Sequence, residues 1–452
     1  MWWHGPRTQL LRALFLDWLG QLLVLVAIMC LPAWLVPSFD GSSKLEIYWL
    51  WIIFCLLLYP LIGWLFGSYT VLRWRRLAFP LLLQRLVFTA MATLIVVAIV
   101  RWFVNPGEEV WLVHWNVQLV WIGGLTAWSL LMRIALRRGL LLPDPPRLLL
   151  LASDHEISGI LKAWSRVALP QRLETITPLA FEQLLNEGSE PLLVALTPSI
   201  RNDINLTGLI ECLEIQDPRF VQTISVISLF EKQQERLPPA LVADICLSQV
   251  DLPWAAPFSI QAQLKRLADL MVAAVLLLIT APFVGLAALL IWLEDQGPVF
   301  YRQQRSGWLG RPFTVLKLRT MRVQPNSSQI LWTQPDDQRI TAVGHWLRRL
   351  RLDELPQLLN VLNGEMSLIG PRPERPELEH DLERHIPHYR KRHWMRPGLS
   401  GWAQVCAPYA SSIEDSDLKL SYDLYYLRHF STWLDLVILF CTIKTVLKAR
   451  GR

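Results

Sequence analysis

Four long apolar stretches constrain the fold of this chain more than any other feature of its sequence. Each is near ~20 residues, the length at which a helix crosses the ~30 Å hydrocarbon core of a bilayer. The four run over Leu10–Val36, Ile47–Gly67, Leu81–Val104 and Val110–Met132. The first is longer than a cleavable signal peptide and lacks its small-residue cleavage site. Residues 1–140 are therefore predicted to form a four-helix transmembrane bundle.

Charges in the loops between these stretches predict their orientation. Arginines stand at Arg7 and Arg12 where the first stretch begins, at Arg73, Arg75 and Arg76 after the second, and at Arg133, Arg137 and Arg138 after the fourth. Basic loops stay in the cytoplasm, so both ends of the bundle are predicted to be cytoplasmic. Asp17 and His114 lie in or near the stretches. They are either a proton or ion path or, as we favour, helix-end groups that reach the membrane interface.

The composition agrees with a membrane protein and narrows the range of partners. Of 452 residues, 52% are hydrophobic and 22 are Trp, more than a soluble protein usually carries. The net charge of +6 suits a cytoplasmic-leaflet surface or anionic substrates. Zinc-finger spacing, RNP-like motifs and a long basic arm are lacking in the sequence, so nucleic acid is not an expected partner. The six cysteines form no CxxC pair, which indicates a reducing compartment.

A middle domain is predicted over residues 141–258, after the proline-rich linker Leu142–Pro146. Helix-like stretches alternate with apolar runs at Leu148–Ala152, Leu192–Leu196 and Ile224–Leu229. This alternation is typical of a Rossmann-like parallel α/β unit. A dinucleotide site would need the glycines of GxGxxG after the first run, where Ala152–Glu156 stands instead. The domain is therefore predicted to be structural or regulatory.

A fifth apolar stretch, Leu267–Leu293, is long enough to cross a bilayer if straight. Basic residues stand at both its ends, which places both ends on one side of the membrane. Pro282 lies near the middle and kinks a helix, and each half would rise only about 20 Å. Two interpretations remain open at this point. Residues 265–294 form either a re-entrant helix that returns to the cytoplasm or a straight span that places the C-terminal domain outside the cell.

Two adjacent acids, Asp353 and Glu354, are the strongest candidates for chemistry. Pro356 and the pair Asn363-Gly364 predict a short helix with both acids at its N-terminus. Upstream, residues 301–350 hold nine Lys or Arg against two Asp. A carboxylate within a cationic surround suits phosphoryl chemistry, as nucleophile or as metal ligand. The alternative is an acid pair that only caps a helix.

Further motifs surround the acid pair in a fixed order. They are Val299–Gly307, Pro312–Met321, Met366–Pro373 and Arg396–Gln404. With the acid pair, this order resembles the bacterial sugar transferase family, the polyprenyl-phosphate hexose-1-phosphate transferases, over about residues 260–450. The bundle and the middle domain resemble the large form of that family. Its members carry a kinked helix that dips into the inner leaflet, with Ser-Pro where this chain has Ala281-Pro282, so the resemblance favours the re-entrant interpretation.

The resemblance implies a reaction for the mainly α-helical domain over residues 259–452. A hexose 1-phosphate moves from a UDP-hexose to polyprenyl (undecaprenyl) phosphate, UMP leaves, and assembly of an exopolysaccharide or other surface glycan begins. Asp353 would be the nucleophile that carries the phosphosugar, and Glu354 would bind Mg²⁺. Phosphate or substrate contacts are assigned to Lys317, Arg319, Arg372, Arg396 and Asp423. Arg396 is alternatively a solvated or lipid-facing charge, and Asp423 a residue that only holds the fold.

The resemblance also implies surroundings for the protein. The expected location is the bacterial inner membrane, with the N-terminus, middle domain and catalytic domain in the cytoplasm, in contact with inner-membrane lipid and as a homodimer. Trp433–Leu447 is too short to span a bilayer, and the histidine-rich stretch His380–His393 is interleaved with basic residues that repel zinc. Both are predicted to form interfacial amphipathic helices.

The sequence does not define which hexose the donor carries, and it leaves two alternative functions open. Many family members continue Gly-Trp-Ala-Gln-Val with Asn-Gly-Arg, whereas this chain has Cys406-Ala407-Pro408. The departure leaves the hexose undefined. A membrane-bound glycosyltransferase would use the same donor but release UDP, and a non-catalytic scaffold of a polysaccharide assembly complex would release neither nucleotide.

Overall fold

The computed structural model describes most of the chain. Described are residues 6–29, 45–66, 68–69, 79–104, 115–137, 146–167, 172–187, 191–203, 206–217, 220–242, 247, 252–255, 259–322, 339–408 and 412–447. Most of the linker Leu142–Pro146, together with His114 and the end of the first predicted span, lies outside these residues. The chain forms two compact units, one of residues 1–161 with 167–225 and one of residues 162–166 with 226–452. Each is described by itself.

Four helices form at the four predicted apolar stretches: α1 (Pro6–Met29), α2 (Leu45–Phe66), α3 (Phe79–Val104) and α4 (Trp115–Arg137). They pack around a buried cluster that includes Tyr59, Val97 and Trp121. Large apolar side chains such as Ile95 and Leu131 also stay exposed on the outer faces. Helices that are apolar all round belong in a membrane rather than in water.

Three helices in the described part of the chain are long and apolar enough to cross a membrane. These segments are Leu82–Phe103 in α3, Trp115–Ala135 in α4 and Ile260–Glu294 in a later helix. The described apolar parts of α1 and α2, Ala13–Ile28 and Trp51–Trp64, are shorter. The structure therefore fits a membrane protein, while a bundle of four spans and its orientation stay predictions.

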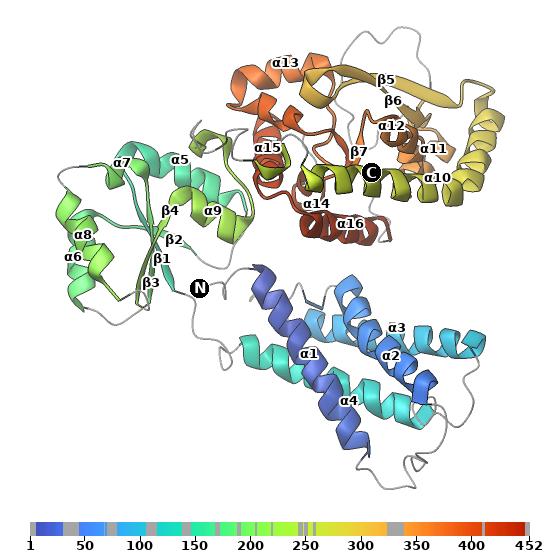
Figure 1. The fold of residues 1–452 in the computed structure, drawn as a ribbon, viewed down its shortest axis with the longest axis horizontal. Helices are drawn as coiled ribbons and strands as arrows, with labels where there is room; N and C mark the ends of the chain where they lie inside the picture. Colours follow the sequence, from blue (N-terminus) through green and yellow to red (C-terminus); the bar gives the residue numbers. More distant parts are fainter. Residues whose placement is uncertain are drawn as a thin grey trace. The chain divides into compact units, whose positions relative to one another are not determined.

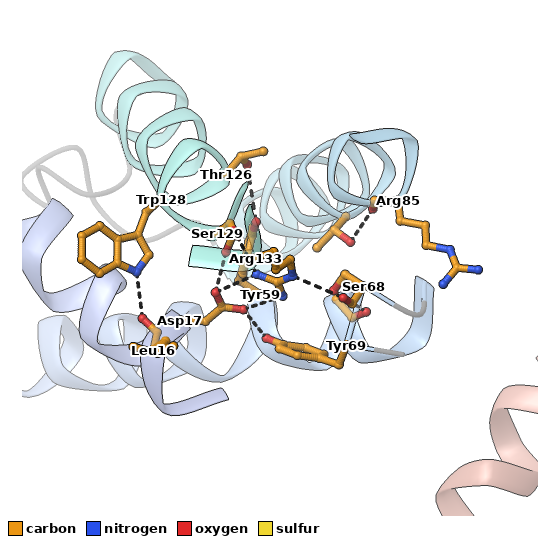
Figure 2. Close-up of polar contacts among 12 residues, drawn as sticks. Leu16, Asp17, Tyr59, Ser68, Tyr69, Arg85, Thr126, Trp128, Ser129 and Arg133 are labelled. Carbon is orange, nitrogen blue, oxygen red and sulfur yellow. Dashed lines mark hydrogen bonds and ion pairs between the residues drawn. The ribbon is translucent and has the colours of Figure 1, made fainter. Parts of the chain in front are cut away.

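A buried polar network joins the helices around Asp17 (Figure 2). Both Asp17 oxygens accept hydrogen bonds from the Arg133 guanidinium, at 3.1 and 3.0 Å. Tyr69 Oη and Ser129 Oγ donate to the same carboxylate at 2.7 and 2.6 Å, and Arg133 Nε donates to the Ser68 carbonyl at 3.2 Å. The Asp17 side chain is fully buried, so the interpretation of Asp17 as an interface-reaching group is wrong. Asp17 and Arg133 lie 116 residues apart, and sequence spacing could not reveal the pair.

The middle of the chain forms a parallel four-stranded sheet in the order β2-β1-β3-β4. Its strands are β1 (Arg147–Leu151), β2 (Leu173–Thr175), β3 (Leu192–Leu196) and β4 (Val221–Ser225), and its helices are α5 (Asp154–Ser165), α6 (Pro178–Glu187), α7 (Pro198–Arg201) and α8 (Thr207–Ile215). The predicted apolar run Ile224–Leu229 divides between two elements, because β4 ends at Ser225 and α9 (Val226–Gln234) begins at once. A short apolar run does not by itself distinguish strand from helix. The parallel sheet is present, and its assignment to the Rossmann type stays a prediction.

An acidic side chain occupies the turn after β1. Glu156 Oε1 accepts a hydrogen bond from Ser199 Oγ at 2.8 Å, and its Oε2 accepts one from the Ser153 amide at 3.3 Å. Burial opposes ionisation of this carboxyl, but its hydrogen bonds outweigh that effect and lower its pKa. An anion at the N-terminus of α5 would repel a diphosphate. The structural or regulatory role of this domain stays a prediction.

The second unit is built on a long helix and a set of short elements (Figure 1). After α9 come η4 (Pro239–Leu241), η7 (Pro253–Ala255) and the long helix α10 (Ile260–Asp295). An antiparallel hairpin follows, with β5 (Phe300–Ser306) and β6 (Pro312–Leu318) joined through η8 (Trp308–Gly310). The remaining elements are α11 (Ala342–Arg349), η9 (Leu352–Gln357), α12 (Leu358–Asn363), β7 (Ser367–Ile369), α13 (Pro376–His385), η10 (Tyr389–Trp394), β8 (Gly398–Ser400), α14 (Trp402–Cys406), α15 (Ile413–Arg428) and α16 (Thr432–Leu447). β7 and β8 form a short parallel pair.

The residues just after β4 pack within this second unit. Trp254 Nε1 donates to the Leu427 carbonyl at 2.8 Å, and Trp402 Nε1 donates to the Glu235 carbonyl at 2.9 Å. The described residues of 226–242 and 252–255 therefore associate with the C-terminal elements. The predicted division into domains at residues 141 and 259 stays a prediction about how the whole chain is organised.

Helix α10 is bent, and Pro282 lies inside it. Figure 1 shows its two arms running in different directions. In the first arm Ala273 packs against α12, and in the second arm Ala287 and Ile291 pack against β6 and α11. The stretch between them exposes apolar side chains, with Leu278 79% exposed. The kink is present as predicted, while re-entry into a bilayer stays a prediction.

Candidate active site

The two acids lie on a single 3-10 turn. Asp353 and Glu354 occupy the first turn of η9, and α12 follows and ends at Gly364, whose φ of 84° is left-handed. Arg351 precedes the turn with a φ of 59°. The predicted short helix with both acids at its start and glycine at its end is confirmed, although its first part is 3-10 rather than α. Neither acid is its N-cap residue.

Glu354 is held by cations from two other elements. Its Oε1 accepts a hydrogen bond from Lys317 Nζ at 3.2 Å and another from Arg372 Nη2 at 2.6 Å. Arg351 Nη1 lies 3.7 Å from the other oxygen, Oε2. Burial alone would raise the pKa of this carboxyl, but the charges of Arg372 and Lys317 outweigh it and hold the pKa well below its usual range. Glu354 therefore stays ionised.

Asp353 is in the opposite situation. Within the described part of the chain, no group donates a hydrogen bond to its carboxylate or forms an ion pair with it. Burial, and then the negative charge of Glu354, raise the pKa of Asp353 to about 6 against the partial opposition of Lys317. A carboxylate with a raised pKa beside fixed cations is a candidate for chemistry, and the nucleophile role of Asp353 stays a prediction.

Lys317 is positioned by the strand that carries it. Asn360 Nδ2 donates to the Thr314 carbonyl at 2.8 Å, and Asn360 Oδ1 accepts from the Leu316 amide at 3.3 Å. Asn360 thus fixes β6 against α12, with Lys317 one residue farther along the strand. Burial lowers the pKa of Lys317, and Glu354 works against that effect. Sequence reasoning missed Asn360, although its amide sits in the apolar run that follows the acids.

Arg372 is positioned by a tight crossing of two chain segments. Gly370 donates its amide to the Ser400 carbonyl at 2.8 Å, and Gly398 donates to the Pro371 carbonyl at 2.8 Å. A Cβ on Gly370 would collide with the backbone of residues 396–398, so glycine is required there. Arg392 Nη2 donates to the carbonyl of Arg372 at 2.8 Å. The guanidinium of Arg372 then reaches Glu354 from a rigid base.

The other predicted site residues lie in different surroundings. Arg319 is 7% exposed, and its guanidinium lies against Gly297. Arg396 stacks on the Trp308 ring at 5.0 Å. Burial lowers the pKa of Arg396, and the positive charge of Arg266 lowers it further. Asp423 is 1% exposed. The structure therefore brings Asp353, Glu354, Lys317 and Arg372 together, and the substrate contacts assigned to the other three stay predictions.

The acid pair offers hard oxygen donors of the kind that Mg²⁺ prefers. Mg²⁺ usually takes one or two carboxylates and completes its shell with water and substrate phosphates. Lys317 and Arg372 bind Oε1 of Glu354, and Oε2 has a longer contact of 3.7 Å with Arg351 Nη1. Oε2 and the Asp353 carboxylate are therefore the oxygens of this turn that could hold an ion. Among the described residues, no group of three or more His, Cys, Asp or Glu gathers into a metal site. The donor set fits an ion shared with a phosphate substrate rather than one caged by protein alone.

Comparison with known proteins bears on the same segment. Residues 260–449 match the family described as bacterial sugar transferase. The UDP-glucose:undecaprenyl-phosphate glucose-1-phosphate transferase of Caulobacter vibrioides (strain ATCC 19089 / CIP 103742 / CB 15) is 42% identical over 185 residues, which are 40% of this chain and 69% of the relative. This chain belongs to the bacterial sugar transferase family.

Two longer members of the sugar transferase family match over a smaller share of their length. The UDP-N-acetylgalactosamine-undecaprenyl-phosphate N-acetylgalactosaminephosphotransferase of Aeromonas hydrophila is 44% identical over 43% of this chain and 46% of the relative. The UDP-glucose:undecaprenyl-phosphate glucose-1-phosphate transferase of Escherichia coli (strain K12) is 39% identical over 40% of this chain and 39% of the relative. The chain thus covers less than half the length of these two proteins.

The family match contains the whole acid-pair cluster. Asp353, Glu354, Lys317 and Arg372 all lie within residues 260–449, as do both arms of α10. The match begins at residue 260, so the assignment of the preceding residues to the large form of the sugar transferase family stays a prediction.

Proposed function

We propose that this sugar transferase family member moves a sugar 1-phosphate from a UDP-sugar to undecaprenyl phosphate and releases UMP. The observation that supports this proposal is a contrast on one turn: Glu354 Oε1 binds Lys317 and Arg372, whereas half-buried Asp353 has no hydrogen-bond partner among the described residues. The printed names of the relatives, which transfer glucose 1-phosphate or N-acetylgalactosamine phosphate to undecaprenyl phosphate, support the substrate classes.

The first step is attack by an Asp353 oxygen on the sugar-bearing phosphorus of the donor. The new Asp–O–P bond forms as the bond from that phosphorus to the bridging diphosphate oxygen breaks, and UMP leaves with the bond's electron pair. Ionised Asp353 is required, and a pKa of about 6 leaves the carboxyl mostly ionised at neutral pH. A nucleophile of this kind splits one difficult transfer between two anions into two easier ones.

In the second step an oxygen of undecaprenyl phosphate attacks the same phosphorus. The bond to Asp353 breaks, the carboxylate returns, and the lipid diphosphate sugar leaves. Arg372 and Lys317 keep Glu354 ionised, and their positive charge beside the acid pair would favour the approach of phosphate oxygens. Mg²⁺ held by Glu354 would supply further neutralisation of the phosphate charge.

Both ends of α10 are anchored in the same unit, which supports a cytoplasmic catalytic domain. Near the first end, Lys265 Nζ lies 2.8 Å from Asp435, and Arg266 donates to the Val361 carbonyl at 2.7 Å. Near the second end, Glu294 accepts from the Ala342 amide at 3.0 Å. A straight helix of 36 residues would separate its ends by about 54 Å. The anchoring favours a helix that dips into the inner leaflet and returns.

The proposed setting follows from that anchoring. The protein would lie in the bacterial inner membrane with its catalytic domain in the cytoplasm, where UDP-sugars are made, and α16 would lie in the interface. The product would start a surface glycan such as an exopolysaccharide. A homodimer remains an expectation from the family.

Intact-mass measurement tests the proposal directly. The full-length protein in detergent or nanodiscs is mixed with Mg²⁺ and, in separate samples, UDP-glucose, UDP-galactose or UDP-N-acetylgalactosamine, without lipid acceptor. One donor is expected to add the mass of its sugar phosphate to Asp353 and to release UMP. Asp417→Asn, an acid-to-amide change on α15, serves as the matched control and is expected to keep the adduct. Release of UDP, or an adduct that persists in Asp353→Asn, would refute the mechanism.

A further inference from the structure

Resting on this proposed function, we infer that Asp423 is a positioning residue that acts through Arg392 to fix Arg372. Asp423 lies on α15, Arg392 on η10, and Arg372 just after β7. The three residues form a chain of contacts from the interior of the unit to Glu354, in which Arg392 contacts the main-chain carbonyl of Arg372. This role differs from the substrate contact that the sequence assigned to Asp423.

The first contact is a buried ion pair. Arg392 Nη2 lies 3.1 Å from Asp423 Oδ2, and the two side chains are 6% and 2% exposed. Burial raises the pKa of Asp423 to about 6, and Arg392 is the strongest group that opposes this rise. A buried pair of this kind is costly to break, because removal of one partner leaves the other charge uncompensated.

The second contact runs from Arg392 to the main chain of Arg372. The Arg392 Nη2 group that faces Asp423 also donates to the Arg372 carbonyl at 2.8 Å. Its Nη1 group donates to the Tyr389 hydroxyl, which holds the other side of the guanidinium. Arg392 therefore has a fixed orientation, set by Asp423 on one side and by Tyr389 on the other.

The third contact reaches the acid pair. Arg372 stands between Pro371 and Pro373, whose rings restrict the backbone on either side. The adjoining Pro373 carbonyl accepts from Arg305 Nη1 at 3.3 Å. With its backbone fixed in this way, Arg372 places its guanidinium 2.6 Å from Glu354. A small rotation at the carbonyl would move that guanidinium away from the acid.

Direct contact between Asp423 and a phosphate is physically unfavourable. The carboxylate is almost inaccessible, and a phosphate carries the same sign of charge. The cation next to Asp423 is already committed to it and to a backbone carbonyl. The position suits support of a catalytic arginine rather than recognition of a substrate.

A double-mutant cycle tests the inference through turnover. Asp423→Asn is expected to slow UMP release about 10- to 100-fold in the wild-type background, the scale of a slightly misplaced site group. In the Arg372→Ala background the same change should slow it less than about threefold, because the residue through which it acts is gone. Asp417→Asn, on the same helix and paired with Arg166, should leave the rate unchanged in both backgrounds. Two losses that simply multiply would overturn the inference.

A second measurement does not depend on turnover. Modification of Arg372 by phenylglyoxal, mapped by peptide mass spectrometry on the folded protein, should be faster in Asp423→Asn and unchanged in Asp417→Asn. Arg392→Lys keeps the charge opposite Asp423 but removes the fork that reaches the Arg372 carbonyl, so it should fold and still expose Arg372. Unchanged reactivity in both Asp423→Asn and Arg392→Lys would refute the relay. Absence of UMP release from wild-type protein would refute the proposed function instead.

Discussion

Two carboxylate clusters in this protein, one fully buried and one half-buried, differ in how many hydrogen bonds the acids receive. In the helical bundle, Asp17 receives hydrogen bonds from Arg133, Tyr69 and Ser129, so both its oxygens are occupied (Figure 2). In the C-terminal unit Lys317 and Arg372 bind Glu354, and no described residue donates a hydrogen bond to its neighbour Asp353. Both clusters put acid beside arginine inside the protein.

The difference separates a structural role from a chemical one. A fully paired buried acid has no free lone pair for a substrate, and its value is to fix how α1, α4 and the end of α2 meet. Asp353 lies beside cations that bind its neighbour, and its pKa is raised. The proposed nucleophile role assigns a reactive oxygen to this acid. Substitutions at the two clusters should therefore affect different measurements.

The largest effect is expected at the unpaired acid. Asp353→Asn preserves shape but removes the attacking oxygen anion, so UMP release should fall by at least about 10³-fold. The phosphosugar adduct should be absent by intact mass, while the unfolding temperature stays near the wild-type value because the carboxylate has no partner to lose. A variant that kept a tenth of wild-type turnover would contradict the assignment of Asp353 as nucleophile.

A smaller loss is expected at the paired acid of the same turn. Glu354→Gln removes the counter-charge of Lys317 and Arg372, and UMP release should slow about 10²-fold. The adduct should still form, slowly, because Asp353 is intact. Adduct formation is followed by rapid quench and mass measurement in wild type and variant. Complete absence of the adduct would assign the nucleophile role to Glu354 or to both acids.

The bundle cluster should show the reverse behaviour. Asp17→Asn leaves Arg133 buried without its counter-charge and should lower the free energy of unfolding by about 3 kcal/mol. UMP release per folded molecule should stay within about twofold of wild type. Thermal unfolding in detergent gives the stability, and the paired replacement Asp17→Leu with Arg133→Met is expected to recover most of it. An unchanged melting temperature in Asp17→Asn would remove the structural role.

Much of the catalytic segment could be predicted from sequence because its chemistry is local. The acids, Pro356 and Gly364 lie within a dozen residues, so turn and capping rules predicted the short helix and its end. The kink at Pro282 follows from the missing amide of proline. The resemblance to the sugar transferase family then assigned Lys317 and Arg372 to the same site.

The contacts that determine each role are long-range and were not predictable in this way. In the sequence, Arg392 is one of several charges in a basic, histidine-rich stretch. In the structure it donates a hydrogen bond to the carbonyl of Arg372, 20 residues earlier in the chain. Asp17 pairs with Arg133, which lies 116 residues farther along the chain. A local pattern identifies which groups are present, whereas the fold decides which of them remain without a partner.

The smallest effect concerns the protonation of the unpaired acid. Because burial and Glu354 raise the pKa of Asp353 to about 6, the group should be protonated below that pH and ionised above it. In ¹³C-Asp-labelled protein without divalent ion, one carboxyl resonance that disappears in Asp353→Asn should titrate near pH 6. Addition of Mg²⁺ should move that midpoint to lower pH, because a nearby dication favours the ionised form.

The Asp17 resonance, assigned with Asp17→Asn, should not respond to Mg²⁺, since its oxygens are already occupied. A midpoint for Asp353 that Mg²⁺ leaves unmoved would place the ion elsewhere and leave the acid pair without its proposed metal.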